Sequence, residues 1–299
     1  MKLSRRLRRA MLVLLAAGPL GFAGASGLAA WWLTAAVSHP VGAVPTDFSW
    51  PVETVHFPAS AGDVTLAGWF VPCAGAKQAV VLLHGYQADR RMMLARAHWL
   101  RAQGFAVLLY DARACGESGG SNISAGWLET GDLLGAVDFL RGRGFTEFGC
   151  VGVSQGGATI ALAAARLEGL RWAVLESVYP TLRNALDRRF RLRVGLPAWL
   201  AGVLVVPFAE WRLGADVDAV SPRDGAAGRR CPVLVMSGER DGRTQPADAK
   251  EVFDRVPGNK ELWIVPGADH EDLHMAARDE YQRRVLGFIT AANQTNLKI

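Results

Sequence analysis

Short apolar, β-rich runs alternate with stretches of helical periodicity along most of this chain. The runs predicted as strands are 52–57, 64–71, 79–84, 105–110, 148–153, 172–176, 233–237 and 262–265. The stretches predicted as helices are 90–102, 125–141, 155–167, 246–256 and 272–292. This alternation predicts an α/β fold, a mainly parallel eight-stranded sheet with helices on both faces. The first two strands have no helix between them, so we expect an antiparallel start.

One interval breaks the alternation, because more than fifty residues separate the sixth predicted strand from the seventh. That is too long for an ordinary connection inside a compact domain. The interval holds an arginine-rich segment, 183–193, and then a stretch of sixteen uncharged residues, 194–209, interrupted by two prolines. We predict a helical cap insertion at about 178–230 whose apolar face covers a pocket. The alternative is an extra helix packed on the core without substrate contact.

The N-terminus carries a basic cluster followed by 28 uncharged residues, 10–37. That stretch is long enough to span a bilayer, which needs about 20 apolar residues. A secretory signal peptide has a shorter apolar region before a small-residue cleavage site, for which 23–25 (Ala-Gly-Ala) is a candidate. The uncharged stretch continues past that site and contains Trp31 and Trp32, which suit a membrane interface. We therefore favour an uncleaved anchor over a cleaved signal.

These patterns divide the chain into an anchor or signal segment at 1–37, a proline-containing linker at 38–51 and one domain at 52–299. The positive-inside rule predicts a membrane-anchored protein with its domain on the non-cytoplasmic side, or a secreted or periplasmic one if the segment is cleaved. The net charge of +5 resides in five basic residues among the first nine. The remainder is neutral, so no nucleic-acid partner is predicted.

The pattern G-x-S-x-G occurs twice, around Ser118 and around Ser154. A nucleophilic serine on this motif sits on a sharp turn between a strand and a helix, flanked by small residues. Ser154 directly follows the predicted strand 148–153 and precedes a helix rich in glycine and alanine. Ser118 lies well beyond its strand and precedes poor helix formers. We predict Ser154 as the nucleophile and Ser118 as an ordinary loop serine.

A serine nucleophile needs a base and an orienting carboxylate. Of six histidines, His270 is the best base, because it follows the last predicted strand at the edge where α/β sites assemble. Asp241 follows the preceding strand and is the predicted carboxylate, with Glu239 and Glu176 as competing acids. The order Ser154, Asp241, His270 is typical of strand-turn-helix serine hydrolases.

An oxyanion hole requires two N–H donors aimed at the carbonyl oxygen. The backbone N–H of Gln155, directly after the serine, is predicted to supply one. The loop after the third strand, His84-Gly85-Tyr86, is predicted to supply the other through the N–H of Tyr86. His84 itself is expected to brace this loop by hydrogen bonds.

With these residues placed, 52–292 resembles the α/β-hydrolase superfamily, and within it the serine aminopeptidase-like and monoacylglycerol-lipase-like branch. The matching motifs are His84-Gly85, the loop 111–118, the elbow at Ser154, the spacing 238–241 and the segment 267–270. The family pattern D-x-R-G-x-G-x-S is matched except that Ala114 stands at the first glycine. The resemblance implies an α/β-hydrolase fold and serine-dependent hydrolysis of esters, thioesters or amides, with no cofactor and no metal.

The predicted function is thus a serine esterase, cleaving a small-molecule carboxylic ester or thioester with a lipid or other acyl group through an acyl-enzyme. The alternatives are a serine peptidase or amidase of the same fold and a non-catalytic anchored binding protein. A zinc peptidase is a further alternative, because 270–274 reads H-E-x-x-H, although His270 is expected in a turn rather than on a helix. The arginines of 183–193 either meet anionic head groups or solvate a helix, and solvation is preferred for most of them.

Overall fold

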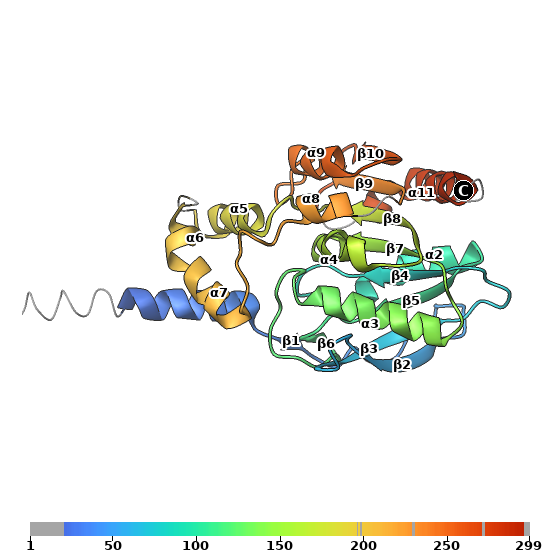
Figure 1. The fold of residues 1–299 in the computed structure, drawn as a ribbon, viewed down its shortest axis with the longest axis horizontal. Coiled ribbons are helices and arrows are strands. Elements are labelled where there is room, and N and C mark those ends of the chain that lie inside the picture. The colour runs from blue at the N-terminus through green and yellow to red at the C-terminus, as the bar shows by residue number, and fades with distance from the viewer. Residues whose placement is uncertain (1–20, 196, 198, 229–230, 271–272, 296–299) are drawn as a thin grey trace, which may run out of the picture.

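The structure is a computed structural model that describes residues 21–195, 197, 199–228, 231–270 and 273–295. An eight-stranded sheet with the order β10-β9-β8-β7-β4-β5-β3-β2 forms its centre (Figure 1). Its strands are β2 (Glu53–Pro58), β3 (Thr65–Val71), β4 (Ala79–Leu83), β5 (Ala106–Tyr110), β7 (Phe148–Val153), β8 (Leu170–Glu176), β9 (Val233–Gly238) and β10 (Lys260–Val265). The eight strands coincide with the predicted ones to within a few residues.

Most of the sheet is parallel. β4, β5, β7, β8, β9 and β10 pair in parallel, whereas β3 pairs antiparallel with both β2 and β5. The predicted α/β-hydrolase fold and its antiparallel start are therefore confirmed. Since consecutive parallel strands place their carboxyl ends at one edge, the loops after β4, β7, β9 and β10 lie along the same edge.

Helices cover both faces, and each face has its own apolar core. The helices on one side are α3 (Glu129–Gly142), α4 (Gln155–Ala163) and α9 (Pro246–Arg255); those on the other are α2 (Leu94–Ala102) and α11 (Arg278–Thr295), with α10 (Leu273–Ala276) leading into α11. Strand β4 shows why its sequence is a continuous apolar run. Val81 and Leu83 pack into the first core, while Val80 and Leu82 pack into the second.

The long interval after β8 forms the predicted helical cap. Its helices are α5 (Leu182–Val194), α6 (Trp199–Leu204), α7 (Val206–Leu213) and α8 (Pro222–Gly225). Pro207 stands in the first turn of α7, where its missing N–H has no intrahelical acceptor to lose. Helices α5, α6 and α7 lie beyond the end of the sheet, whereas α8 packs against α4 (Figure 1).

The N-terminal part of the described chain lies against the cap. Residues 21–34 form a helix whose Ala30 packs with Val205 and Ala209 (Figure 1). The chain then forms β1 (Val37–Ser38), which pairs with the two-residue strand β6 (Cys115–Gly116). Thus the anchor segment predicted from the sequence ends in a helix that belongs to the folded domain.

The predicted membrane segment and the predicted linker can each be compared with the structure. Within the described residues, no helix is both long enough and apolar enough to cross a bilayer. Residues 10–20 of the predicted span 10–37 lie outside the described residues. The predicted linker 38–51 follows the surface of the domain, where Val41 is buried and Phe48 and Trp50 pack against the core.

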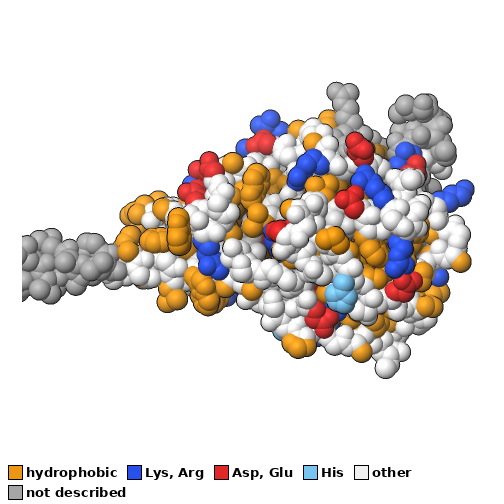
Figure 2. Space-filling view, turned by 60° about the horizontal axis from the view of Figure 1, so that its bottom comes forward, with side chains coloured by type: hydrophobic (Ala, Val, Ile, Leu, Met, Phe, Trp, Pro, Cys, Tyr) orange, Lys and Arg blue, Asp and Glu red, His pale blue; other side chains and the backbone are white. Residues whose placement is uncertain are grey.

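The end of the molecule that holds helix 21–34 and the cap is unusually apolar on its surface. Figure 2 shows hydrophobic side chains gathered there. The exposed large ones on these elements are Phe22, Leu28, Trp31, Trp32, Leu192, Trp199, Val203 and Trp211. A surface of this kind marks a site of contact with another apolar phase or partner.

Candidate active site

Ser154 occupies a strained turn between β7 and α4. Its φ of 52° is rare for a residue with a side chain and costs about 1–3 kcal/mol. The turn can close because the residues two positions before and after Ser154 are glycines. A Cβ on Gly156 would lie 2.4 Å from the carbonyl oxygen of Leu83, and one on Gly152 would lie 2.4 Å from the backbone of Gly156. The small residues of G-x-S-x-G are therefore a steric requirement here.

Three side chains from three loops meet at the carboxyl edge of the sheet. The Oγ of Ser154 lies 3.1 Å from Nε2 of His270, which follows β10. The other ring nitrogen of His270, Nδ1, lies 2.8 Å from Oδ2 of Asp241, which follows β9. The structure thus joins the three predicted residues in one hydrogen-bonded chain, in which the carboxylate fixes the orientation of the imidazole.

Asp241 is held by donors on its other sides. Its Oδ1 accepts from the backbone N–H groups of Arg243 and Thr244, both at 2.8 Å. The hydroxyl of Thr244 lies 2.7 Å from Oδ2 and 3.0 Å from Nδ1 of His270. Burial acts to raise the pKa of Asp241, but the hydrogen bonds from His270 and Thr244 outweigh burial and hold that pKa below its usual range. Thr244 carries no motif in the sequence and was not predicted.

The competing acids are engaged elsewhere. Glu176 is buried, and its Oε2 lies 2.6 Å from Nη2 of Arg96 while its Oε1 accepts from the hydroxyl of Tyr281 at 2.6 Å. Glu239 accepts a hydrogen bond from the backbone N–H of Gly267 at 2.8 Å. The structure therefore brings Asp241, rather than either of these residues, to the imidazole.

The other serine in a G-x-S-x-G motif, Ser118, stabilises a loop. The hydroxyl of Ser118 donates to the carbonyl oxygen of Asp111 at 2.6 Å and accepts from the N–H of Ala67 at 2.9 Å. Both groups are buried, so the hydroxyl satisfies backbone atoms that have no access to water. In the same loop Ala114 adopts a φ of 60°, the left-handed region that explains the glycine of the family pattern at that position.

The H-E-x-x-H segment does not form a shared ligand face. Helix α10 begins at Leu273, so His270 precedes it, and residues 271–272 lie outside the described part of the chain. His274 is buried, with its ring 4.9 Å from that of Tyr281 and its Nε2 3.3 Å from the amide nitrogen of Gln282. Among the described residues no group of three or more His, Cys, Asp or Glu side chains is arranged to hold a metal ion.

The predicted N–H donors border the serine. Gln155 is the first residue of α4, so its N–H has no intrahelical acceptor, and Tyr86 lies in the loop after β4. That loop is fixed by His84, as predicted. Its Nε2 accepts from the N–H of Ala112 at 2.9 Å and its Nδ1 donates to the carbonyl oxygen of Gly85 at 2.7 Å. Burial lowers the pKa of His84 and keeps this brace neutral.

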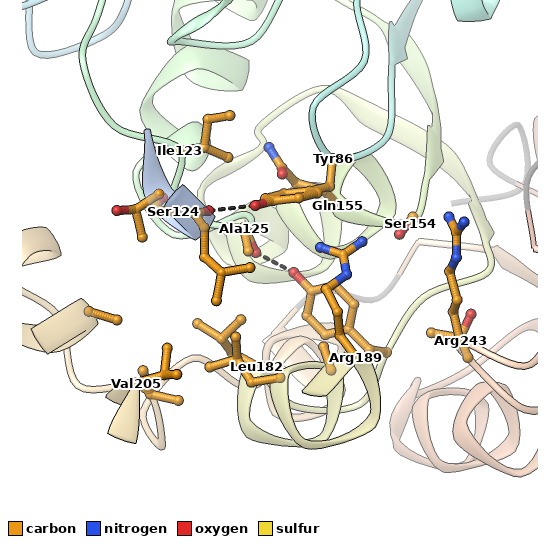
Figure 3. A pocket seen from close by; sticks show the side chains of 18 of the residues that line it. Tyr86, Ile123, Ser124, Ala125, Ser154, Gln155, Leu182, Arg189, Val205 and Arg243 are labelled. Carbon is orange, nitrogen blue, oxygen red and sulfur yellow. Dashed lines mark hydrogen bonds between the residues drawn. The ribbon is translucent and has the colours of Figure 1, made fainter. Parts of the chain in front are cut away.

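A cavity runs from Ser154 under the cap (Figure 3). Its walls are mostly apolar, including Leu33, Ile123, Leu182, Leu186, Val205, Leu213 and Val217. Leu33 comes from the N-terminal helix, and its carbonyl oxygen accepts a hydrogen bond from the hydroxyl of Tyr86. Burial raises the pKa of Tyr86 to about 12, so this phenol stays protonated. The cavity is thus built jointly by the sheet edge, the cap and helix 21–34.

Comparison with known proteins agrees with this architecture. Residues 80–284 match the model of the alpha/beta hydrolase family. This stretch covers more than half of the chain and contains Ser154, Asp241 and His270. The chain therefore belongs to the alpha/beta hydrolase family, and the protein is a hydrolase.

Individual relatives cover most of the chain. Polyketide transferase af380 of Aspergillus fumigatus is 38% identical over 286 aligned residues, which span 79% of this chain and 97% of the relative. The uncharacterized protein YqkD of Bacillus subtilis is 25% identical over 241 residues, 79% of either chain. Among solved structures, the esterase Pf2001 of Pyrococcus furiosus superposes with a TM-score of 0.71 at 25% identity, over 86% of this chain and 98% of the esterase.

Proposed function

We propose that the protein is a serine hydrolase that cleaves a carboxylic ester or thioester, with Ser154 as nucleophile, His270 as base and Asp241 as orienting acid. The observation that carries the proposal is the chain of hydrogen bonds from Ser154 Oγ through His270 to Asp241. His270 Nε2 takes the hydroxyl proton as Oγ attacks the carbonyl carbon, and it returns that proton to the departing alkoxide or thiolate. Water then attacks the acyl-enzyme by the same route and releases the acid.

The oxyanion that forms at the carbonyl oxygen is proposed to be stabilised by the backbone N–H groups of Tyr86 and Gln155. Two features support this assignment. Gln155 begins a helix, so its amide dipole favours negative charge. The Tyr86 loop is fixed by the hydrogen bonds of His84, so its amide needs no rearrangement during the reaction. Losing one such donor typically costs about 3 kcal/mol of transition-state stabilisation.

The apolar walls of the cavity support an acyl group as the bound part of the substrate. An esterase with a TM-score of 0.71 supports ester cleavage over amide cleavage, which is the alternative on the same fold. A panel of p-nitrophenyl esters of increasing acyl length, assayed beside an aminoacyl p-nitroanilide, separates the two. Preference for the anilide would replace the esterase assignment by a peptidase.

The decisive experiment compares the two serines of the duplicated motif. We expect Ser154→Ala to lower kcat for p-nitrophenyl butyrate at least about 10³-fold and to abolish labelling by a fluorophosphonate. Ser118→Ala is the matched control, because the Ser118 hydroxyl hydrogen-bonds to backbone groups of Asp111 and Ala67, away from the His270 imidazole. It should lower stability while the folded fraction keeps its kcat. Undiminished turnover in Ser154→Ala would refute the proposed nucleophile.

We also propose that the N-terminal segment attaches the protein to a membrane, with the domain on the non-cytoplasmic side. The uncharged stretch 10–37 and the exposed Trp31, Trp32 and Trp211 at the same end support this proposal. Fractionation of cells that express the full chain, followed by protease treatment of intact spheroplasts, tests it. Membrane pelleting with a protease-accessible domain is expected. Release of a trimmed, soluble domain would favour the cleaved signal instead.

A further inference from the structure

Charge is distributed unevenly in the cavity next to Ser154. Three arginines, Arg189, Arg193 and Arg243, line it, and the described lining contains no aspartate or glutamate. In Figure 3 the side chains of Arg189 and Arg243 lie on either side of Ser154, whereas Leu182 and Val205 lie farther along the cavity. Among the described lining residues, those beside the serine therefore include cationic side chains, and those under the cap are apolar.

Arg189 differs from its neighbours on α5. Arg183 forms an ion pair with Asp218, and Arg188 lies 3.0 Å from Asp248. Arg189 instead stacks over the ring of Tyr86, with its Cζ 4.3 Å from the ring centroid. Among the described residues no carboxylate forms an ion pair with it, and the positive charges of Arg243 and Arg193 act on it.

This environment disfavours the charge that Arg189 carries. Burial, together with the positive charges of Arg243 and Arg193, lowers the pKa of Arg189, although the neighbouring Tyr86 acts in the opposite direction. A half-buried guanidinium without a carboxylate is stabilised when an anion binds beside it. The stack on Tyr86 fixes the plane of the guanidinium, which favours the bidentate geometry that suits phosphate and carboxylate.

We propose, resting on the hydrolase function above, that the substrate is an acyl ester or thioester whose leaving group carries a phosphate or carboxylate, bound by Arg189. An ester has two arms, the acyl group and the leaving group, and the cavity presents a different surface to each. The acyl arm fits the apolar chamber lined by Leu182 and Val205, which leaves the anionic arm at the guanidinium of Arg189. The leaving group then takes the proton from His270 and departs with its anion intact.

The test uses substrates that share one acyl chain. Decanoyl glycerol is neutral, decanoyl glycerol 3-phosphate bears a lipid phosphate, and decanoyl-coenzyme A is an anionic thioester. We expect kcat/KM of the full-length protein to be at least about tenfold higher for one or both anionic substrates than for the neutral one. Comparison of the two anionic substrates distinguishes a lipid head group from a thioester carrier.

Variants of single arginines show which side chain produces the preference for anionic substrates. Arg189→Gln should reduce the ratio of anionic to neutral kcat/KM at least about tenfold. Arg191→Gln is the matched control, because Arg191 is an exposed arginine of the same helix that does not line the cavity. It should leave the ratio within about twofold. A second readout is competitive inhibition of p-nitrophenyl butyrate hydrolysis by decyl phosphate, which Arg189→Gln should weaken.

The outcomes separate this inference from the function on which it rests. Hydrolysis that depends on Ser154, with an anionic-to-neutral ratio near one that Arg189→Gln does not change, would overturn the anion site and leave the hydrolase. Turnover of these esters that persists in Ser154→Ala would overturn the proposed function itself. An anion preference lost equally in Arg189→Gln and Arg191→Gln would mean that the whole basic surface of α5, not the cavity, attracts the substrate.

Discussion

The two walls of the cavity are held by different interactions, hydrogen bonds at the sheet edge and apolar contacts at the cap. At the sheet edge, Asp241, Thr244 and His270 are buried and hydrogen-bonded to one another within 2.7–3.0 Å. On the cap side, helix 21–34 and α7 meet through small and apolar side chains such as Ala30 and Ala209. Many of the cap's large side chains face solvent.

The difference reflects what each wall does. Proton transfer requires donor and acceptor atoms held within a few tenths of an ångström, which directional hydrogen bonds provide. Holding an acyl chain requires only the exclusion of water, for which non-directional apolar contact suffices. We therefore expect substitutions at the sheet edge to act on kcat, and substitutions in the cap to act on chain-length preference.

The largest effect is expected at Asp241. Asp241→Asn removes the carboxylate that accepts from His270 Nδ1 and favours the wrong tautomer of the ring. We expect kcat for p-nitrophenyl butyrate to fall about 10³- to 10⁴-fold, with KM changed little. Steady-state kinetics on protein with an unchanged circular-dichroism spectrum measures this. A loss below tenfold would mean that another acid orients the imidazole.

A smaller effect is expected at Thr244, a positioning residue. Thr244→Val keeps the shape of the side chain but removes the hydroxyl that lies 2.7 Å from Asp241 Oδ2. A hydrogen bond to a charged group contributes about 1.5–3 kcal/mol, so kcat should fall at least about tenfold while KM stays constant. Thr244→Ser restores the hydroxyl and should restore most of kcat. Equal losses in both variants would indicate a packing role only.

Substitutions in the cap should change the preference for acyl-chain length rather than kcat. Leu186→Trp adds volume at a half-buried position that lines the apolar chamber. We expect kcat/KM for p-nitrophenyl decanoate to fall about fivefold relative to p-nitrophenyl acetate, since one or two methylenes lose their contacts at about 0.8 kcal/mol each. Unchanged relative rates across the ester series would show that acyl chains do not enter this chamber.

The smallest effect is expected where the N-terminal segment meets the domain at His39. Its Nδ1 lies 2.7 Å from the carbonyl oxygen of Val37 and its Nε2 lies 3.0 Å from Asp89. Only the imidazolium can donate to both, and the hydrogen bonds to Val37 and Asp89 raise the pKa of His39. The stabilisation is therefore fully present below pH 6.5, the usual value of the unfolded chain, and is lost as pH rises through the raised value.

The side chain of His39 is 39% exposed, and screening by solvent keeps the contribution below about 1 kcal/mol. Amide hydrogen exchange of residues 35–42, corrected for intrinsic rates, should quicken between pH 6 and pH 8.5 in the natural protein. His39→Gln removes the titratable group and is expected to show no such change. A pH-dependent loss of protection in both proteins would assign the effect to another group.

The sheet could be predicted because its signal is local. Strands such as β4 and β9 are continuous apolar runs, since both faces of a central parallel strand are buried. The turn at Ser154 was predictable for the same reason. The close contacts of this turn require glycine at 152 and 156, and both glycines stand within two residues of the serine. His270 and Asp241 could be proposed from their positions after neighbouring strands.

Other features depend on tertiary packing. Helix 21–34 is apolar whether it meets lipid or α7, so composition did not predict that Leu33 would line the cavity. Thr244 orients Asp241 through a turn that has no sequence signature. The arginines of α5 look alike in sequence, and only the rotation of the helix separates Arg189 from the ion-paired Arg183.

The hydrogen bond from Tyr86 to Leu33 has a practical consequence for anyone who produces this protein. A recombinant version that begins after residue 37 would leave the phenol without its acceptor and open one side of the chamber to water. Rates and chain-length profiles recorded on such a shortened enzyme would describe a wider, wetter site than the natural one. Specificity should therefore be measured on protein that retains residues 21–37.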